Sequence, residues 1–590
     1  MNPGPKSNRA SRFGFAACNV YKSLAIDLHR LRSYMTPRSL THRAPLLGLV
    51  LAWATGSAAV HLGLLPPRPA LLASIAAGSL LLGGCAILST VRPLAGRLGA
   101  VLLAVSVAAA GALRTGQDRA RLADWDALSL PPREARLELR IERLFSSAEP
   151  GKVGGLARVV SAPPHLADLR GQRISFSTTW PAGAGAPPLR GAEFSALGLL
   201  APLPFAPPAG SFDRFLADEG ANFAFSRARL EGPPRPAGPW SRFCGAASAR
   251  LEKILRSGLG EKHDLADLYV AMLLGRKQAL SIEQKDGFVR SGTMHLFAIS
   301  GLHIAAIALA FNTLLALARA PARARFVAGT ALLWLYVEIT GGEASAVRAF
   351  WMITCLLGAR LLRAPSNSLS ALAASALGAL VLSPHQLFGA GFLMSYGIVA
   401  ALLLYGVPLQ EKWHSAWQPW AHLPPEARGW RRDLVEDAGR WVLAALALGL
   451  AATLVGTPAT LAFFGLVAPG GFFVNLVLIP VSSLALFAGV ASLFVGLLGL
   501  APLSILFNHA GALVLSWMEA VVAASLRVPG MSWPAAFAPS WTAGLTGLGV
   551  MILLAVGYVL RWPRRLGGYW LPYLALGAAL LVAVERVASP

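Results

Sequence analysis

Charged residues and cysteines are both scarce in this 590-residue chain. Asp, Glu, Lys and Arg make up 14% of the sequence, whereas a soluble globular protein carries about 25%. Hydrophobic residues reach 55%, and the mean hydropathy is +0.55. This composition excludes an ordinary soluble domain and predicts that most of the chain lies in lipid. The four cysteines form no CxxC motif and no close pair, so a disulfide framework is not supported.

Motifs for nucleotide hydrolysis and for hydrolytic catalysis are also absent. The sequence has no GxxxxGK[ST] loop, which argues against ATP-driven pumping by this chain. It has no GxSxG nucleophile turn. Its 11 histidines form no HxHxDH cluster, the motif with which metallo-β-lactamase-type nucleases bind two metals. We therefore expect no enzyme activity, no catalytic residue, no metal site and no cofactor.

Basic residues are in excess, with 52 Lys and Arg against 29 Asp and Glu, for a net charge of +23. Membrane proteins gather Lys and Arg in cytoplasmic loops, which accounts for much of such an excess. A nucleic-acid partner is the alternative explanation. The tail 1–44 carries eight basic residues and a single acid, Asp27. We expect this tail to stay in the cytoplasm, ahead of an uncleaved first span.

The sequence contains about 13 apolar runs of the kind that form membrane helices. Three come first, at 45–63, 68–90 and 97–113. Ten follow later, at 294–318, 326–341, 344–363, 368–383, 387–406, 441–466, 472–499, 502–526, 541–560 and 568–585. The two short runs at 326–341 and 344–363 could instead be re-entrant. The predicted fold class is a polytopic α-helical membrane protein of about 13 spans with a small external all-β domain.

The positions of basic residues between the apolar runs predict how these spans are oriented in the membrane. If the tail is inside, then Arg92, Arg97, the basic residues after 318 and 360, the loop 407–440 and the basic residues after 560 all fall inside as well. The positive-inside rule therefore predicts a cytoplasmic N-terminus, an external segment 115–235 and an external C-terminus. The predicted domains are the tail 1–44, three helices in 45–114, the β domain 115–235, a linker 236–293 with amphipathic helices, and the membrane domain 294–590.

The segment 115–235 predicts several short strands. Residues 136–144 alternate polar and apolar side chains, as a half-buried strand does. A partly open barrel of the oligonucleotide-binding (OB) type would fit, although strand number alone does not select it. Arginines and the aromatic residues Phe145, Phe176 and Trp180 suit single-stranded nucleic acid, while solvated strand edges explain the arginines equally well. Residues 211–220 predict a helical or turn element.

Polar residues inside apolar runs are the candidate site residues, because polar groups in a bilayer usually have a function. A continuous helix from residue 294 would place His303 roughly 13 Å along its axis, with His295 at the outer interface. The alternatives are a helix break at Gly301, with the freed backbone groups satisfied by Ser300 and the imidazole rings, or a polar constriction. The spacing and the lack of partner ligands argue against a metal site.

Two further regions supply candidates. In 338–348, Glu343 and Arg348 predict either a structural ion pair or, for the arginine, a phosphate contact. In 502–526, Asn508 and Glu519 share a polar stripe that predicts either contacts between helices or a water-filled lumen, and Asn475 lies among broken helices. The full set of candidate channel residues is His295, Ser300, His303, Glu343, Arg348, Asn475, Asn508 and Glu519.

Six stretches together closely resemble the ComEC-type competence proteins. They are MLLGRKQALS at 272–281, SGTMHLFAISGLHI at 291–304, TGGEASAVRA at 340–349, GFLMSYG at 391–397, TPATLAFFG at 457–465 and NLVLIP at 475–480. The resemblance implies an inner-membrane, multi-pass channel that takes up single-stranded DNA during natural transformation, with the β domain in the periplasm engaging DNA. It also implies partners: single-stranded DNA, the lipid bilayer, a separate cytoplasmic motor and periplasmic DNA-delivery proteins.

The sequence departs from the family pattern at its end. Many relatives continue into an external metallo-β-lactamase-like nuclease domain, whereas this sequence ends at Pro590. We expect either that another protein degrades the second strand or that the chain is a shorter variant with altered function. A transporter of a small solute or lipid-linked substrate, and a non-transporting membrane scaffold, are the alternative functions.

Overall fold

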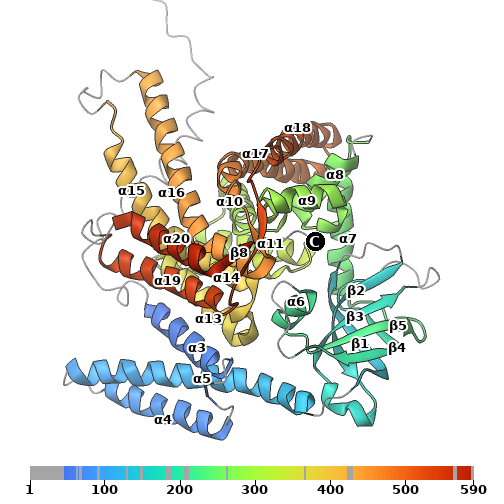
Figure 1. Cartoon of the computed structure of the whole chain (residues 1–590). Helices are drawn as coiled ribbons and strands as arrows, with labels where there is room; N and C mark the ends of the chain where they lie inside the picture. Colours follow the sequence, from blue (N-terminus) through green and yellow to red (C-terminus); the bar gives the residue numbers. More distant parts are fainter. Residues whose placement is uncertain are drawn as a thin grey trace, which may run out of the picture.

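A computed structural model describes residues 45–586 except 62–63, 66–68, 89–92, 128–130, 146–150, 181–187, 205–210, 261–262, 364–366, 421–428 and 563–567. The predicted tail 1–44 lies outside the described residues. A large helical part and a small β-barrel lie side by side (Figure 1). Each of the apolar runs coincides with a helix.

The first three helices pack as one group. They are α3 (Pro45–His61), α4 (Pro69–Leu88) and α5 (Pro93–Ala127). The α3 and α5 backbones approach so closely that a Cβ on Gly56 would lie 1.8 Å from the carbonyl oxygen of Ala108. The helix α5 continues well past residue 114, where the prediction started the β domain. The polar residues after 113 end the apolar run but include good helix formers such as Arg, Ala and Leu, so the helix does not end there.

The barrel has five strands: β1 (Arg133–Phe145), β2 (Lys152–Ser161), β3 (Arg173–Thr179), β4 (Glu193–Pro202) and β5 (Phe223–Leu230). They close in the order β1-β2-β3-β5-β4, with β3 and β5 parallel. The predicted alternation on β1 is confirmed, because Leu137, Leu139 and Ile141 are almost fully buried. Two short helices accompany the strands, η3 (Pro164–Leu169) and α6 (Phe212–Asp218). The all-β barrel is thus confirmed, and its OB-like character stays a prediction.

Four short helices connect the barrel to the membrane part: α7 (Pro239–Arg256), α8 (His263–Leu274), η5 (Lys277–Ala279) and α9 (Ile282–Arg290). The helix α8 is almost wholly buried from Leu268 to Leu274 and packs against later helices. Ion pairs join α7 to its neighbours, since Arg256 contacts Asp267 at 2.7 Å and Arg276 contacts Glu252. The connecting segment is therefore part of the core.

The remaining elements make up the membrane part. They are η6 (Met294–Phe297), α10 (Gly301–Leu317), α11 (Ala322–Ile339), α12 (Ala344–Leu361), α13 (Ser368–Leu382), η7 (Pro384–Phe388), α14 (Ala390–Ala401), η8 (Leu402–Gly406), α15 (Val407–Ala416), α16 (Trp430–Phe464), β6 (Leu466–Val467), α17 (Gly471–Leu497), α18 (Ala501–Leu526), β7 (Trp533–Phe537), α19 (Thr542–Val559), η11 (Gly568–Trp570), α20 (Leu571–Ala583) and β8 (Val584–Arg586). Strands β6, β7 and β8 form a small sheet between helix ends.

Within the described residues, seven helical segments are long and apolar enough to cross a membrane, and five shorter apolar helices accompany them. The short run at 344–363 is one of the seven, as α12. These helices support a multi-pass membrane protein. The count of about 13 spans stays a prediction, because helices shorter than about 17 residues do not by length alone cross a bilayer core.

Candidate functional site

The helix that carries the histidine motif begins at Gly301, so the continuous helix from residue 294 is wrong. Residues 294–297 form the separate turn η6, followed by extended backbone at Ala298. His303 therefore lies in the first turn of α10. Its Nδ1 accepts hydrogen bonds from the Ser300 backbone N–H at 3.3 Å and pairs with the Ser300 hydroxyl at 2.9 Å. The predicted break, satisfied by Ser300 and an imidazole, is confirmed.

His303 presents an unused hydrogen-bond donor to the protein interior. Because the Ser300 N–H donates to Nδ1, the proton of a neutral imidazole lies on Nε2. Nε2 has no partner in the described part of the chain, and the side chain is only 2% exposed. His295 is exposed on η6 and hydrogen-bonds the backbone of Gly292. The described residues contain no group of three or more His, Cys, Asp or Glu that could hold a metal ion.

The start of α17 contacts the stretch 291–304, which contains the two histidines. Asn475 Nδ2 donates to the Gly292 carbonyl at 3.4 Å, and its Oδ1 lacks a partner among the described residues. A Cβ on Gly471 would lie 3.1 Å from the Ser291 carbonyl oxygen. A larger residue at position 471 would require the 291–292 backbone to move by a few tenths of an ångström. The 291–304 and 475–480 stretches, far apart in the sequence, thus meet at one place.

Glu343 and Arg348 do not form the predicted ion pair. Glu343, the N-cap of α12, contacts Lys277 on η5 at 3.5 Å. The guanidinium of Arg348 donates from Nη2 to the Gly391 carbonyl at 2.8 Å. Residues five apart on a helix point about 140° away from each other, which explains why the two side chains find different partners.

Arg348 is a buried cation without a bonded carboxylate. Its side chain is 6% exposed, and no described carboxylate lies within salt-bridge distance of it. Its Nε has no hydrogen-bond partner in the same described residues. Because a buried charge is expensive to leave unpaired, this arginine is the most unusual group in the helical part.

Three helix starts gather around Arg348 and His303. The Ser345 hydroxyl donates to the Ile299 carbonyl at 2.9 Å, which joins the start of α12 to that of α10. Arg348 reaches Gly391 in the first turn of α14. We call Ser300, His303, Ser345, Arg348 and Gly391 the helix-start cluster. Helix N-termini carry unpaired N–H groups and a partial positive charge, so the cluster suits an anion.

Asn508 lies outside this cluster and is structural. It is fully buried, and Nδ2 donates to the carbonyls of Ile254 at 2.8 Å and Ser257 at 2.9 Å. Its Oδ1 accepts from Ser492 at 2.6 Å. Glu519 accepts a hydrogen bond from Gln284 on α9 at 2.9 Å. Contacts between helices, one of the two predictions for this stripe, are confirmed for Asn508.

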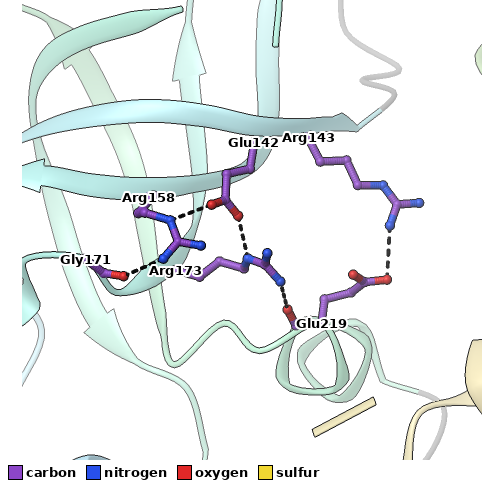
Figure 2. A network of polar contacts seen from close by, with 6 residues as sticks. All are labelled: Glu142, Arg143, Arg158, Gly171, Arg173 and Glu219. Carbon is purple, nitrogen blue, oxygen red and sulfur yellow. Dashed lines mark hydrogen bonds and ion pairs between the residues drawn. The ribbon is translucent and has the colours of Figure 1, made fainter. Parts of the chain in front are cut away.

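Most barrel arginines pair with glutamates across strands. Arg136 pairs with Glu231, Arg140 with Glu193, Arg143 with Glu219, and both Arg158 and Arg173 with Glu142. Figure 2 shows Glu142 between Arg158 and Arg173, each at 2.6 Å. Burial raises the pKa of Glu142, but the two guanidiniums outweigh this effect and leave the pKa below its ordinary value.

The barrel contacts the helical part close to the helix-start cluster. A Cβ on Gly220, which follows α6, would lie 2.9 Å from the His385 ring on η7. Glu338, at the end of α11, pairs with Arg190 of the barrel at 3.5 Å and accepts from Trp240 Nε1 at 3.2 Å. Barrel and helices therefore share one junction.

Comparison with known protein families gives a match within the helical part. Residues 272–560 match the family described as Competence protein. These residues belong to the competence protein family. All six stretches quoted from the sequence lie wholly within this competence domain, with the first beginning at its first residue, and the ComEC-type resemblance is confirmed.

A relative supports the same assignment. The chain is 29% identical over 142 residues to ComE operon protein 3 of Bacillus subtilis (strain 168). That alignment covers 24% of this chain and 18% of the relative, so the chain matches less than a fifth of the relative's length. No solved structure matches the chain.

Two exposed aromatic residues next to the competence domain were missed at the sequence level. Phe176 and Trp180, which were candidates for nucleic-acid contact, are 3% and 8% exposed inside the barrel. Phe212 and Phe215 of α6 are instead exposed at 62% and 39%. Their spacing of three, on a short helix capped by Ser211, puts both rings on one face. The spacing of the two phenylalanines was the signal in the sequence that could have identified this exposed face.

Proposed function

We propose that the chain is an inner-membrane channel that admits a single DNA strand into the cytoplasm during natural transformation. The competence family supports a role in DNA uptake. In this proposal the chain is a channel and not an enzyme, the N-terminus is cytoplasmic, and the barrel faces the periplasm. A separate motor and periplasmic delivery proteins would supply the DNA and the driving force.

The proposal rests on Arg348, which is buried and has no ion pair with a carboxylate of the described residues. A polyanion crosses lipid only along a path that offers positive charge without holding each phosphate tightly. Arg348 has no ion pair to break in the described structure, and its Nη2 donates to a carbonyl. The helix starts beside it add N–H donors and partial positive charge. Interrupted helices that direct their N-termini at an anion are a recurring design of membrane transport sites.

Loss of the gene in a naturally competent host tests this function. Labelled double-stranded DNA is supplied, and the label that enters the cytoplasm as nuclease-protected single strands is measured. We expect that the deletion abolishes this signal and that a plasmid copy restores it, while DNA binding at the cell surface persists. Unchanged internalisation in the deletion strain would contradict the proposal and favour a small-solute transporter or a scaffold.

A further inference from the structure

The barrel presents an unusual aromatic surface beside its junction with the competence domain. The rings of Phe212 and Phe215 stack with centroids 5.8 Å apart and planes 26° apart. Phe145 meets them at 6.0 and 5.7 Å. Leu216, on the neighbouring side of α6, is 2% exposed and anchors the helix to the barrel with Ala221. Leu216 and Ala221 therefore make the buried attachment of α6, whereas the rings of Phe212 and Phe215 contact Phe145 and keep an exposed surface.

A charged pair adjoins these rings. The Arg143 guanidinium lies 5.9 Å from the centre of the Phe145 ring and donates to the Glu219 carboxylate at 3.0 Å. Arg173 donates to the main-chain carbonyl of Glu219 at 2.6 Å, which fixes the position of that residue (Figure 2). We call Phe145, Phe212, Phe215, Arg143 and Glu219 the α6 corner. Figure 1 shows α6 on the side of the barrel that faces the helices.

Guanidinium groups bind carboxylates and phosphates with the same planar donors. Glu219 therefore lies where the phosphate of a bound strand would lie if a base stacked on the phenyl rings. Because Arg173 holds the main chain at Glu219, the carboxylate stays opposite Arg143 when no strand is bound. An incoming phosphate would take the place of the carboxylate at Arg143, and the displaced carboxylate of Glu219, which is partly exposed, would be solvated by water instead.

We propose that the α6 corner is a binding site for one unpaired base and its phosphate in single-stranded DNA, and that Glu219 occupies the phosphate position until DNA arrives. This inference rests on the proposed function, and it names the residues that would first contact the DNA strand. Phe212 and Phe215 take the base, and Arg143 takes the phosphate. Exposed aromatic rings beside a cation are the combination that proteins use for single strands without sequence preference.

The position of the corner on the molecule favours DNA over lipid as the occupant. Gly220, directly after Glu219, lies against His385 of η7. The turn η7 leads into α14, whose Gly391 carbonyl binds Arg348. The α6 corner therefore adjoins η7, the turn that precedes Gly391 of the helix-start cluster.

The first test measures affinity with the purified full chain in lipid nanodiscs and a fluorescent oligothymidylate. The double variant Phe212→Ala, Phe215→Ala is expected to weaken binding roughly tenfold, as loss of base stacking does. Phe243→Ala is the matched control, because Phe243 is 52% exposed and stacks on Trp240 with the same 5.8 Å centroid spacing. Equal affinities for the double variant and the control would overturn the proposal.

The second test removes the competing carboxylate. Glu219→Gln frees Arg143, so we expect tighter binding and a plot of log affinity against log salt that is steeper by about 0.7, the contribution of one phosphate contact on a single strand. Glu231→Gln, which breaks the pair with Arg136 elsewhere on the barrel, is the matched control and should change neither quantity. Weaker binding by Glu219→Gln, or the same gain in both variants, would count against the site.

The third test locates the base and separates this inference from the proposed function. An oligonucleotide with 5-iodouracil should crosslink to the peptide that contains Phe212 and Phe215. Strong single-strand binding with crosslinks elsewhere would refute the site and leave the channel intact, whereas no binding by the wild-type chain would count against both. Crosslinks of this peptide to a photoreactive phospholipid alone would assign the rings to the bilayer and overturn the proposal.

Discussion

Arg158 and Arg173 face each other as register partners on β2 and β3. Like charges in this position repel, and Glu142 removes the repulsion by accepting from both. The register of β1 shifts between Ile141 and Arg143, so Glu142 lies at an irregularity of the strand. Such a bulge re-aims a side chain, here toward the adjacent strands. One carboxylate of β1 thus bridges the two facing guanidiniums of β2 and β3.

At the residue scale, Glu142→Gln should loosen the barrel. The change leaves two guanidiniums facing each other, and we expect a loss of about 1–3 kcal/mol in barrel stability. In the wild type, the lowered pKa of Glu142 means that its contribution is complete above the ordinary glutamate pKa of about 4.3. The contribution is then lost as the pH falls through the lowered pKa.

Hydrogen exchange of β1–β3 peptides in the full chain measures this effect. We expect Glu142→Gln to reduce protection at pH 6, and the wild type to approach the variant as the medium is acidified. Equal protection of both proteins at pH 6 would show that Glu142 does not hold the strands together.

At the scale of elements, glycines set how closely helices pack. A Cβ on Gly511 of α18 would lie 2.4 Å from the Tyr269 hydroxyl oxygen, and one on Gly489 of α17 would lie 2.2 Å from Leu273. Tyr269 and Leu273 belong to the buried helix α8. The connecting segment is thus inserted between the barrel and α17 and α18, and cannot shift without moving them.

Alanine at Gly511 tests this packing. We expect Gly511→Ala to destabilise the protein by about 1–3 kcal/mol through overpacking against Tyr269. Gly547→Ala is the control, because a Cβ there meets nothing within 4 Å, and alanine favours a helix by roughly 0.5–1 kcal/mol over glycine. Thermal unfolding in detergent should therefore give a lower midpoint for the first and an unchanged or higher one for the second. The reverse order would refute close packing at α8.

At the scale of the whole molecule, the sequence predicted features that depend on local patterns. Apolar runs marked the helices, and the alternation of 136–144 marked β1, because burial follows the period of each element. Helix ends were less predictable, since polarity changed at residue 114 while α5 continued. The ion-pair alternative for Glu343 and Arg348 failed because the partner of Glu343, Lys277, is distant in sequence. The exposed face of α6 depended on how the barrel closes, which no local pattern encodes.

The central claim is that phosphates pass Arg348, and nuclease-protected uptake of labelled DNA tests it most directly. Competent cells carrying Arg348→Gln, with normal protein levels in the membrane, should internalise at least about tenfold less single-stranded DNA, because a charge-assisted phosphate contact is lost. Arg348→Lys should keep part of the uptake. Normal uptake by Arg348→Gln at normal protein level would contradict the account.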